Sequence, residues 1–168
     1  EMKSDLYHNH AFMLTHFHDF ILNSKVAEKI IEEYKAALSL REMLAKHNNT
    51  YGIVVAQTMV NIGDIHRVLH QFDKAERYAS EAKSKYKQFL SENVISTIDH
   101  FNQAHLLYVT TLRDKAFYKQ DIVEFNSMMN EIKELKTWAI KHKDEIEYYD
   151  TIIIEDSISQ KMATKFIL

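Results

Sequence analysis

The chain has 168 residues, of which 46% are hydrophobic and 27% are charged, and its formal net charge at pH 7 is −3. This length allows one domain with a sizeable core, and the apolar content argues against a disordered chain. The weakly negative charge gives no reason to expect nucleic-acid binding. The absence of cysteine excludes disulfides and thiolate zinc sites, and no apolar run approaches the roughly 18 residues that a membrane span needs.

The composition favours helices over sheets, because the chain has no proline and only two glycines, and the turns of a sheet need such residues. Apolar residues recur at steps of three and four in several stretches, as in Tyr51, Val55 and Thr58, which predicts helices with one buried face. The separating segments are short and polar, which predicts antiparallel neighbours. In chain order, helices are predicted over residues 5–22, 25–46, 50–70, 73–91, 94–119 and 121–142.

Most of these helices are preceded by a residue whose side chain is able to cap the first turn. A side-chain oxygen at such a position accepts a hydrogen bond from a backbone N–H that has no partner inside the helix. The candidate caps are Ser24, Asn49, Asp73, Asn93 and Asp121.

The tail over residues 144–168 is ambiguous in its pattern. Its segment EYYDTIIIED, at 147–156, contains the aromatic and β-branched residues that are typical of a strand. A lone strand would have no partner, and isolated strands are not stable. We therefore predict a last helix that packs over the open end of the helical stack.

Residues 56–82 carry small and aromatic residues in a specific order. The first helix of this stretch contains Met59, Ile62, Gly63 and His66, and the second contains Phe72, Ala75, Tyr78 and Ala82. This order resembles a tetratricopeptide repeat, in which small residues let two helices approach closely and an aromatic residue fills the corner between them. The resemblance implies that helix pairs stack into a superhelix and share a core.

Weaker signs of repetition lie on both sides of this stretch. YKAALSL at 34–40 is similar to the end of a second repeat helix, and Ala37 precedes Ala82 by 45 residues (37 to 82), which is longer than the usual period of 34. FYKQDIVEF at 117–125 resembles an inter-helix corner, although a register that aligns 61–63 with 102–104 stays open.

The expected architecture is an all-α, tetratricopeptide-like superhelix that forms a single domain over residues 1–168. It consists of three antiparallel helix pairs and a closing helix, and the alternative is a plain bundle of amphipathic helices. The repeats are expected at residues 5–46, 50–91 and 94–142, and the closing helix at 144–168.

The ten histidines of the chain raise the question of a metal site. Two histidines on one helix face need a spacing of three or four, but HNH at 8–10 and HFH at 16–18 place theirs about 200° apart. His66 and His70 have the right spacing but lack an obvious acidic third ligand. No bound metal and no cofactor is therefore expected.

No pattern in the chain indicates an enzyme. No serine lies in a nucleophile-elbow motif, and two glycines are too few for a loop that cradles phosphate. Adjacent carboxylates such as Glu32 and Glu33 are expected on solvent-exposed faces.

The family resemblance implies a concave binding groove lined by the first helix of each pair. The candidate groove residues are Gln57, Asn61, Asp64 and Arg67 on one helix and Asn102, His105 and Tyr108 on the next first helix. We expect Asn61 to hydrogen-bond a bound peptide backbone and Arg67 to pair with an acidic group. Val60 and Asp64 stand where chaperone-binding members of the family carry a lysine and an asparagine that clamp a carboxylate, so a C-terminal carboxylate ligand is not expected.

The resulting hypothesis is a domain that binds a protein or a peptide. Its lengthened repeats resemble those of bacterial regulatory proteins, so it is expected to be the sensory or interaction region of a signalling or transcription regulator. A peptide-pheromone receptor is the alternative, and a helical enzyme or metal protein is a third hypothesis. A soluble, cytoplasmic location is favoured, while a periplasmic location and a homodimer stay open. The chain begins at Glu1, as expected of a fragment or a processed form.

Overall fold

The computed structural model of the chain describes residues 1–17, 24–91, 97–147 and 149–166, and the regular elements in these ranges are helices, without a strand. The prediction of an all-α fold is therefore confirmed. The helices are α1 (Met2–Phe17), α2 (Ser24–Ala45), α3 (Tyr51–Val68), α4 (Phe72–Ser91), α5 (Ile98–Lys119), α6 (Ile122–Lys141), the 3-10 helix η3 (Lys143–Glu145) and α7 (Tyr149–Phe166). None of these helices is both long enough and apolar enough to cross a membrane.

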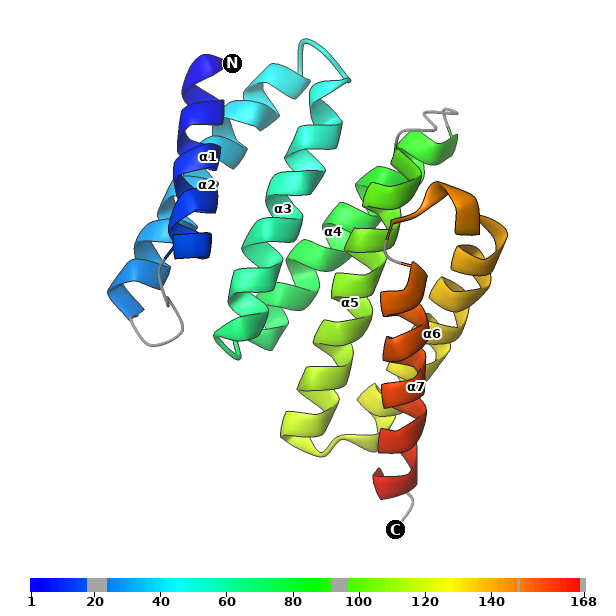
Figure 1. Cartoon of the computed structure of the whole chain (residues 1–168). Coiled ribbons are helices and arrows are strands. Elements are labelled where there is room, and N and C mark those ends of the chain that lie inside the picture. Colours follow the sequence, from blue (N-terminus) through cyan, green and yellow to red (C-terminus); the bar gives the residue numbers. More distant parts are fainter. Residues whose placement is uncertain (18–23, 92–96, 148, 167–168) are drawn as a thin grey trace.

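The helices alternate between two layers. Consecutive helices pack against each other and run in opposite directions (Figure 1). In that view α1, α3, α5 and α7 form the front layer, and α2, α4 and α6 lie behind them. α3 also contacts α5, and α5 contacts α7, so the front layer is continuous across these three helices.

The C-terminal tail forms a helix, as predicted in preference to a strand. This helix begins at Tyr149 rather than at Asp144, because residues 143–145 form the 3-10 helix and Ile146 is extended, with φ −124° and ψ 131°. Ile146 and Ile152 are both buried against the helices that α7 covers. The segment that resembled a strand therefore contributes Ile152 to the core, while Ile154 is 59% exposed.

The core consists of two clusters of buried side chains. The first fills the space between α1, α2, α3 and α4 and reaches α5, and its largest members are Tyr34 and Tyr86. The second fills the space between α5, α6 and α7 and is centred on Phe125 and Met128. Leu90 packs against both clusters, so the core continues from one helix pair to the next.

Gly63 lies at a close crossing of α3 with α4. A Cβ atom on Gly63 would lie 3.3 Å from Tyr78 Cβ and 3.5 Å from the Ala75 carbonyl oxygen, both on α4. It would lie nearer still to Leu107 of α5, at 3.1 Å from Cδ2. Three helices therefore meet at this glycine. The other predicted signature residues are all buried, namely Met59, Ile62, Phe72, Ala75 and Ala82.

The helix caps agree only in part with the sequence prediction. Asp121 is confirmed as a cap, because its Oδ1 accepts hydrogen bonds from the backbone N–H groups of Val123 at 2.8 Å and Glu124 at 3.1 Å. The cap expected at Asn49 is wrong, because Thr50 precedes α3 and hydrogen-bonds to Asn48 Oδ1 through its own N–H and hydroxyl.

Of the remaining three cap predictions, one is wrong and two concern side chains outside the described residues. The cap at Asp73 is wrong by two residues, because α4 begins at Phe72 and its cap position is residue 71. The Asp73 carboxylate instead accepts a bond from Lys115 Nζ at 3.1 Å. Asn93, the side chain of Ser24 and the predicted helix end at 22 lie outside the described residues.

Candidate functional site

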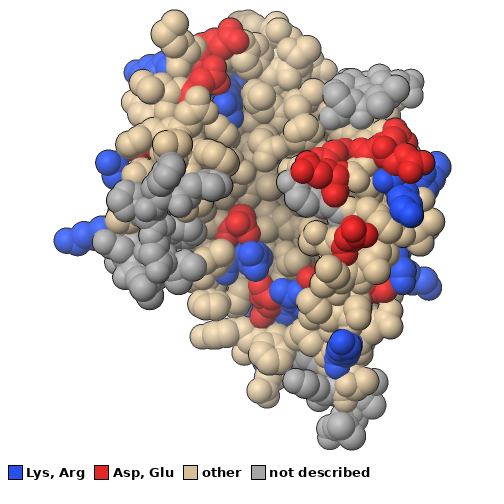
Figure 2. Space-filling view, viewed as in Figure 1, with Lys and Arg blue, Asp and Glu red and all other residues tan. Residues whose placement is uncertain are grey.

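A cavity of about 410 Å³ opens between the front-layer helices α1, α3 and α5. Figure 2 shows this face of the molecule, with charged side chains of both signs gathered near its centre. The described residues that line the cavity are Phe12, Thr15, Tyr34, Gln57, Val60, Asn61, Asp64, Ile65, Arg67, Gln103, Leu106, Leu107 and Thr110.

The lining positions repeat along the chain. The lining residues Gln57, Val60, Asn61 and Asp64 of α3 are each followed 46 residues later (57 to 103) by one on α5, namely Gln103, Leu106, Leu107 and Thr110. Thr15 of α1 precedes Asn61 by the same 46 residues (15 to 61). Equivalent faces of α3 and α5 therefore point into one cavity, and α1 adds Thr15 at a matching position.

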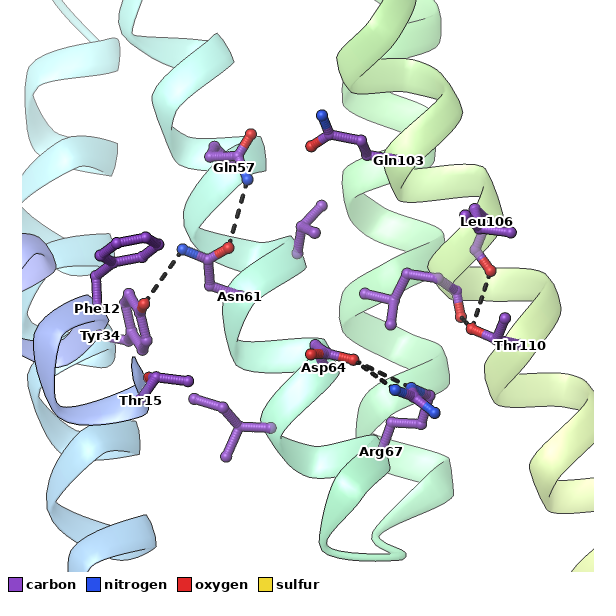
Figure 3. Close-up of a pocket in the computed structure, with 13 residues that line it drawn as sticks. Phe12, Thr15, Tyr34, Gln57, Asn61, Asp64, Arg67, Gln103, Leu106 and Thr110 are labelled. Atoms are coloured by element: carbon purple, nitrogen blue, oxygen red, sulfur yellow. Dashed lines mark hydrogen bonds and ion pairs between the residues drawn. The ribbon is translucent and has the colours of Figure 1, made fainter. Parts of the chain in front are cut away.

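The α3 side of this cavity contains the groove candidates that the sequence analysis placed on that helix. All four predicted residues of that helix, Gln57, Asn61, Asp64 and Arg67, lie on the wall (Figure 3). The other three candidates, Asn102, His105 and Tyr108, are not among the described residues that line this cavity. A neighbouring face of α5, with Gln103, Leu106, Leu107 and Thr110, lines the cavity instead.

His105 belongs to a junction between α4, α5 and α6. Its Nε2 donates to Glu131 Oε2 at 2.8 Å, and Lys83 Nζ donates to the same oxygen at 2.6 Å. Lys83 also lies 4.6 Å from the centre of the Tyr108 ring. Burial, together with the nearby Lys83 charge, lowers the pKa of His105 to about 4, so the imidazole is neutral at pH 7. These contacts hold α4, α5 and α6 together behind the cavity.

A chain of hydrogen bonds holds the amide side chains on the cavity wall. Gln57 Nε2 donates to Asn61 Oδ1 at 3.4 Å, and Asn61 Nδ2 donates to the Tyr34 hydroxyl at 3.3 Å (Figure 3). Behind Gln57, the Tyr86 hydroxyl donates to Gln57 Oε1 at 3.4 Å. Burial raises the pKa of Tyr34, so its hydroxyl stays neutral and accepts the bond from Asn61. The amides are therefore oriented, and each keeps hydrogen-bonding capacity for a ligand.

Arg67 is bound on both sides by carboxylates. Its Nε and Nη2 donate to Asp64 Oδ1 at 3.1 and 2.9 Å, and its Nη1 donates to Asp114 Oδ2 at 2.8 Å. Burial alone would lower the pKa of Arg67, but the two carboxylates raise it. The expectation that Arg67 pairs with an acidic group of a ligand loses its basis, because the guanidinium is already neutralised within the protein.

The ion pairs continue from α5 to α7. Asp114 Oδ1 accepts from Arg113 Nη2 at 2.7 Å, and Arg113 Nη1 donates to Glu155 Oε1 at 2.6 Å. Asp64, Arg67, Asp114, Arg113 and Glu155 therefore form one network of alternating charge across the front layer. We call these five residues the ion-pair network.

The predicted histidine motif at 8–10 is divided between two neighbours. His8 Nδ1 accepts from Arg41 Nη1 at 2.9 Å, whereas His10 pairs with Glu33. Within the described part of the chain, no three His, Asp or Glu side chains gather in a way that could hold a metal ion. The motif at 16–18 has its side chains outside that part.

The first helix pair contributes to the cavity in a way that was not predicted from the sequence. Phe12, Thr15 and Tyr34 close one side of the cavity. The 46-residue spacing of Thr15 from Asn61 is the signal that could have identified this side.

Comparison with known proteins gives the chain no relatives from which to transfer a role. No protein-family model, no curated protein and no solved structure gives a significant match to it. The geometry and chemistry of the cavity are therefore the basis for inferring a function.

Proposed function

We propose that the chain is a tetratricopeptide-like domain that binds a peptide, or an extended segment of a protein, in the cavity between α1, α3 and α5. The observation that carries this proposal is the convergence of three front-layer helices on one cavity, with equivalent faces of α3 and α5 and a matching position on α1. Side chains of successive first helices are the ones that a repeat superhelix presents on its concave surface. The order of Gly63, Phe72 and the buried alanines supports the same family resemblance.

The lining has the chemistry that an extended peptide needs. Val60, Ile65 and Leu106 offer apolar contact to its side chains, while Asn61 offers both a donor and an acceptor to its backbone. Ligand sites typically combine a mostly apolar wall with a few oriented polar groups, and 410 Å³ lies within their usual range of about 300–1,000 Å³.

The proposed setting is the sensory or interaction region of a bacterial signalling or transcription regulator. The 46-residue spacing supports this setting, because lengthened repeats resemble those of such regulators. A peptide-pheromone receptor is the second candidate. The modest volume of the cavity favours it, since such a space suits a few residues of a short peptide better than a broad protein surface.

The test is selection of peptides from a phage-displayed library of random dodecapeptides on the whole chain. Selected peptides are then synthesised with acetylated and amidated ends and titrated by fluorescence anisotropy. Gln103→Trp fills the cavity from its α5 wall, and we expect it to weaken binding at least about tenfold. Gln88→Trp makes the same exchange at an exposed site on α4 and serves as the matched control.

Two results contradict the proposal. One is that the library yields no peptide that binds the chain. The other is that the selected peptides bind Gln103→Trp as tightly as they bind the parent protein. In either case the cavity is not a peptide site.

A further inference from the structure

The cavity wall carries one exposed negative charge and one neutralised positive charge. Among its described lining residues, only Asp64 and Arg67 have carboxylate or guanidinium groups. The Asp64 side chain is 53% exposed, whereas that of Arg67 is 25% exposed. The charge that a ligand meets first in the cavity is therefore the carboxylate.

Arg67 is a poor partner for a further anion. Three of its N–H groups are donated to Asp64 and Asp114, which already supply two negative charges. A third carboxylate placed beside them would be repelled by both. The ion-pair network contains three carboxylates and two guanidinium groups, so its net charge is negative.

Asp64 has the capacity to accept a cation. Its Oδ1 receives both bonds from Arg67, and no other described residue donates to its Oδ2. Figure 3 shows Asp64 on the α3 wall of the cavity, with Thr110 on the facing α5 wall. A positively charged group at this place would bond a half-exposed carboxylate and offset the net negative charge of the network.

The walls beside Asp64 suit the aliphatic part of a basic side chain. Val60 lies one helical turn before Asp64, and Leu106 and Leu107 line the opposite wall. Lysine and arginine bury their methylene stems along apolar surface while their charged ends reach a polar group. An apolar slot that leads to a carboxylate therefore matches either side chain.

We propose that the ligand of this cavity is a peptide segment with a lysine or arginine side chain, whose cationic end binds Asp64. This inference rests on the proposed peptide-binding function and adds the class of peptide. It reverses the charge preference that the sequence suggested for Arg67. The cation comes from a side chain rather than from the peptide amino terminus.

The test uses the acetylated and amidated peptides selected from the random library. We expect lysine or arginine to be enriched in them, beside at least one apolar residue. Asp64→Asn keeps an oxygen that accepts from Arg67 but removes the charge, and it should weaken binding about three- to tenfold. Glu81→Gln removes the same charge from an exposed position on α4 and should leave affinity unchanged.

A double-mutant cycle separates a direct contact from a structural effect. Replacing the peptide lysine by norleucine should weaken binding to the parent protein but not to Asp64→Asn, because the interaction is already lost there. Raising the ionic strength from about 0.05 M to about 0.5 M should weaken binding to the parent more than binding to Asp64→Asn.

The outcomes distinguish this inference from the proposed function. If Gln103→Trp abolishes binding but Asp64→Asn and the norleucine peptide bind as well as their parents, the cavity binds peptides and the cation inference is wrong. Enrichment of acidic residues among the selected peptides would also overturn it. If Gln103→Trp has no effect, the cavity assignment fails and the cation inference fails with it.

Discussion

Gly63 and Leu107 lie against each other at the point where α3, α4 and α5 meet. A Cβ atom on Gly63 would be 3.1 Å from Leu107 Cδ2, and Leu107 also lines the cavity. The absence of a side chain at Gly63 thus sets the spacing of two cavity walls.

Substitutions at Gly63 should separate helix propensity from packing. Gly63→Leu should lower the free energy of unfolding by about 1–3 kcal/mol, because the added atoms overpack the crossing. Gly63→Ala should be close to neutral, because a gain of about 1 kcal/mol in helix propensity is offset by the tight contacts with Leu107 and Tyr78. Urea unfolding followed by circular dichroism measures both. A Gly63→Leu protein as stable as the parent would show that no close crossing exists there.

Lys115 is a buried cation that joins three helices. Its Nζ lies 2.7 Å from Glu76, 3.0 Å from Glu124 and 3.1 Å from Asp73. Lys115→Met should destabilise the fold by about 2–4 kcal/mol, because it leaves neighbouring carboxylates without their cation. The control is Lys119→Met, since Lys119 is half exposed and 3.8 Å from Asp73, and it should cost about 1 kcal/mol or less. Equal effects of the two substitutions in urea unfolding would contradict this role.

Arg41 fastens α1 to the rest of the molecule. It donates from Nη1 to Thr58 Oγ1 at 2.7 Å and from Nη2 to Asp5 Oδ1 at 3.0 Å, and it also holds His8. Arg41→Met should speed amide hydrogen exchange throughout α1, because the bonds from the buried Arg41 side chain to Asp5 and His8 are lost together. Mass spectrometry of peptides from α1 and α7 measures the effect. The exposed Arg77→Met is the control, and unchanged exchange in α1 would refute the assignment.

Stability should fall on mild acidification. The folded-state pKa values of His8 and His105 are both lowered to about 4, in each case chiefly by burial, whereas an unfolded histidine titrates near 6.5. Between these values the unfolded chain binds more protons, so stability is lost as the pH falls from about 6.5 toward 4. Each histidine contributes at most about 1.4 kcal/mol per pH unit, and less for the half-buried His8.

Urea unfolding between pH 7 and pH 5 tests this expectation above the main range of carboxylate titration. His105→Gln should reduce the slope of stability against pH, while His47→Gln, at an exposed position, should leave it unchanged. A parent protein whose stability is constant over this interval would contradict the lowered pKa values.

The sequence predicted the helices well because their apolar residues repeat at helical steps and their breaks are polar. It located the α3 wall because Gly63 fixes which face of that helix is packed. On α5 no glycine marks that face, and His105 and Tyr108 fit either the core or a groove. Knowing which face of α5 is buried does not show which of the two neighbouring faces lines the cavity.

Other features depend on residues that are distant in the sequence. Arg67 meets Asp114 and Lys115 meets Glu76 only after the helices stack, so neither pairing has a local signal. The neutralisation of Arg67, and with it the charge preference of the cavity, could therefore not be predicted from the spacing of residues on one helix.

The most direct test of peptide binding in the front-layer cavity is nuclear magnetic resonance of the isotope-labelled chain with a selected peptide. The side-chain amide signals of Gln57, Asn61 and Gln103 report on both sides of the cavity. We predict that these signals shift together and saturate with the affinity measured by anisotropy, and that those of Gln88 on α4 do not. Shifts confined to α4, α6 or the exposed face of α7, with the three cavity amides unchanged, would contradict the claim that the front-layer cavity binds the peptide.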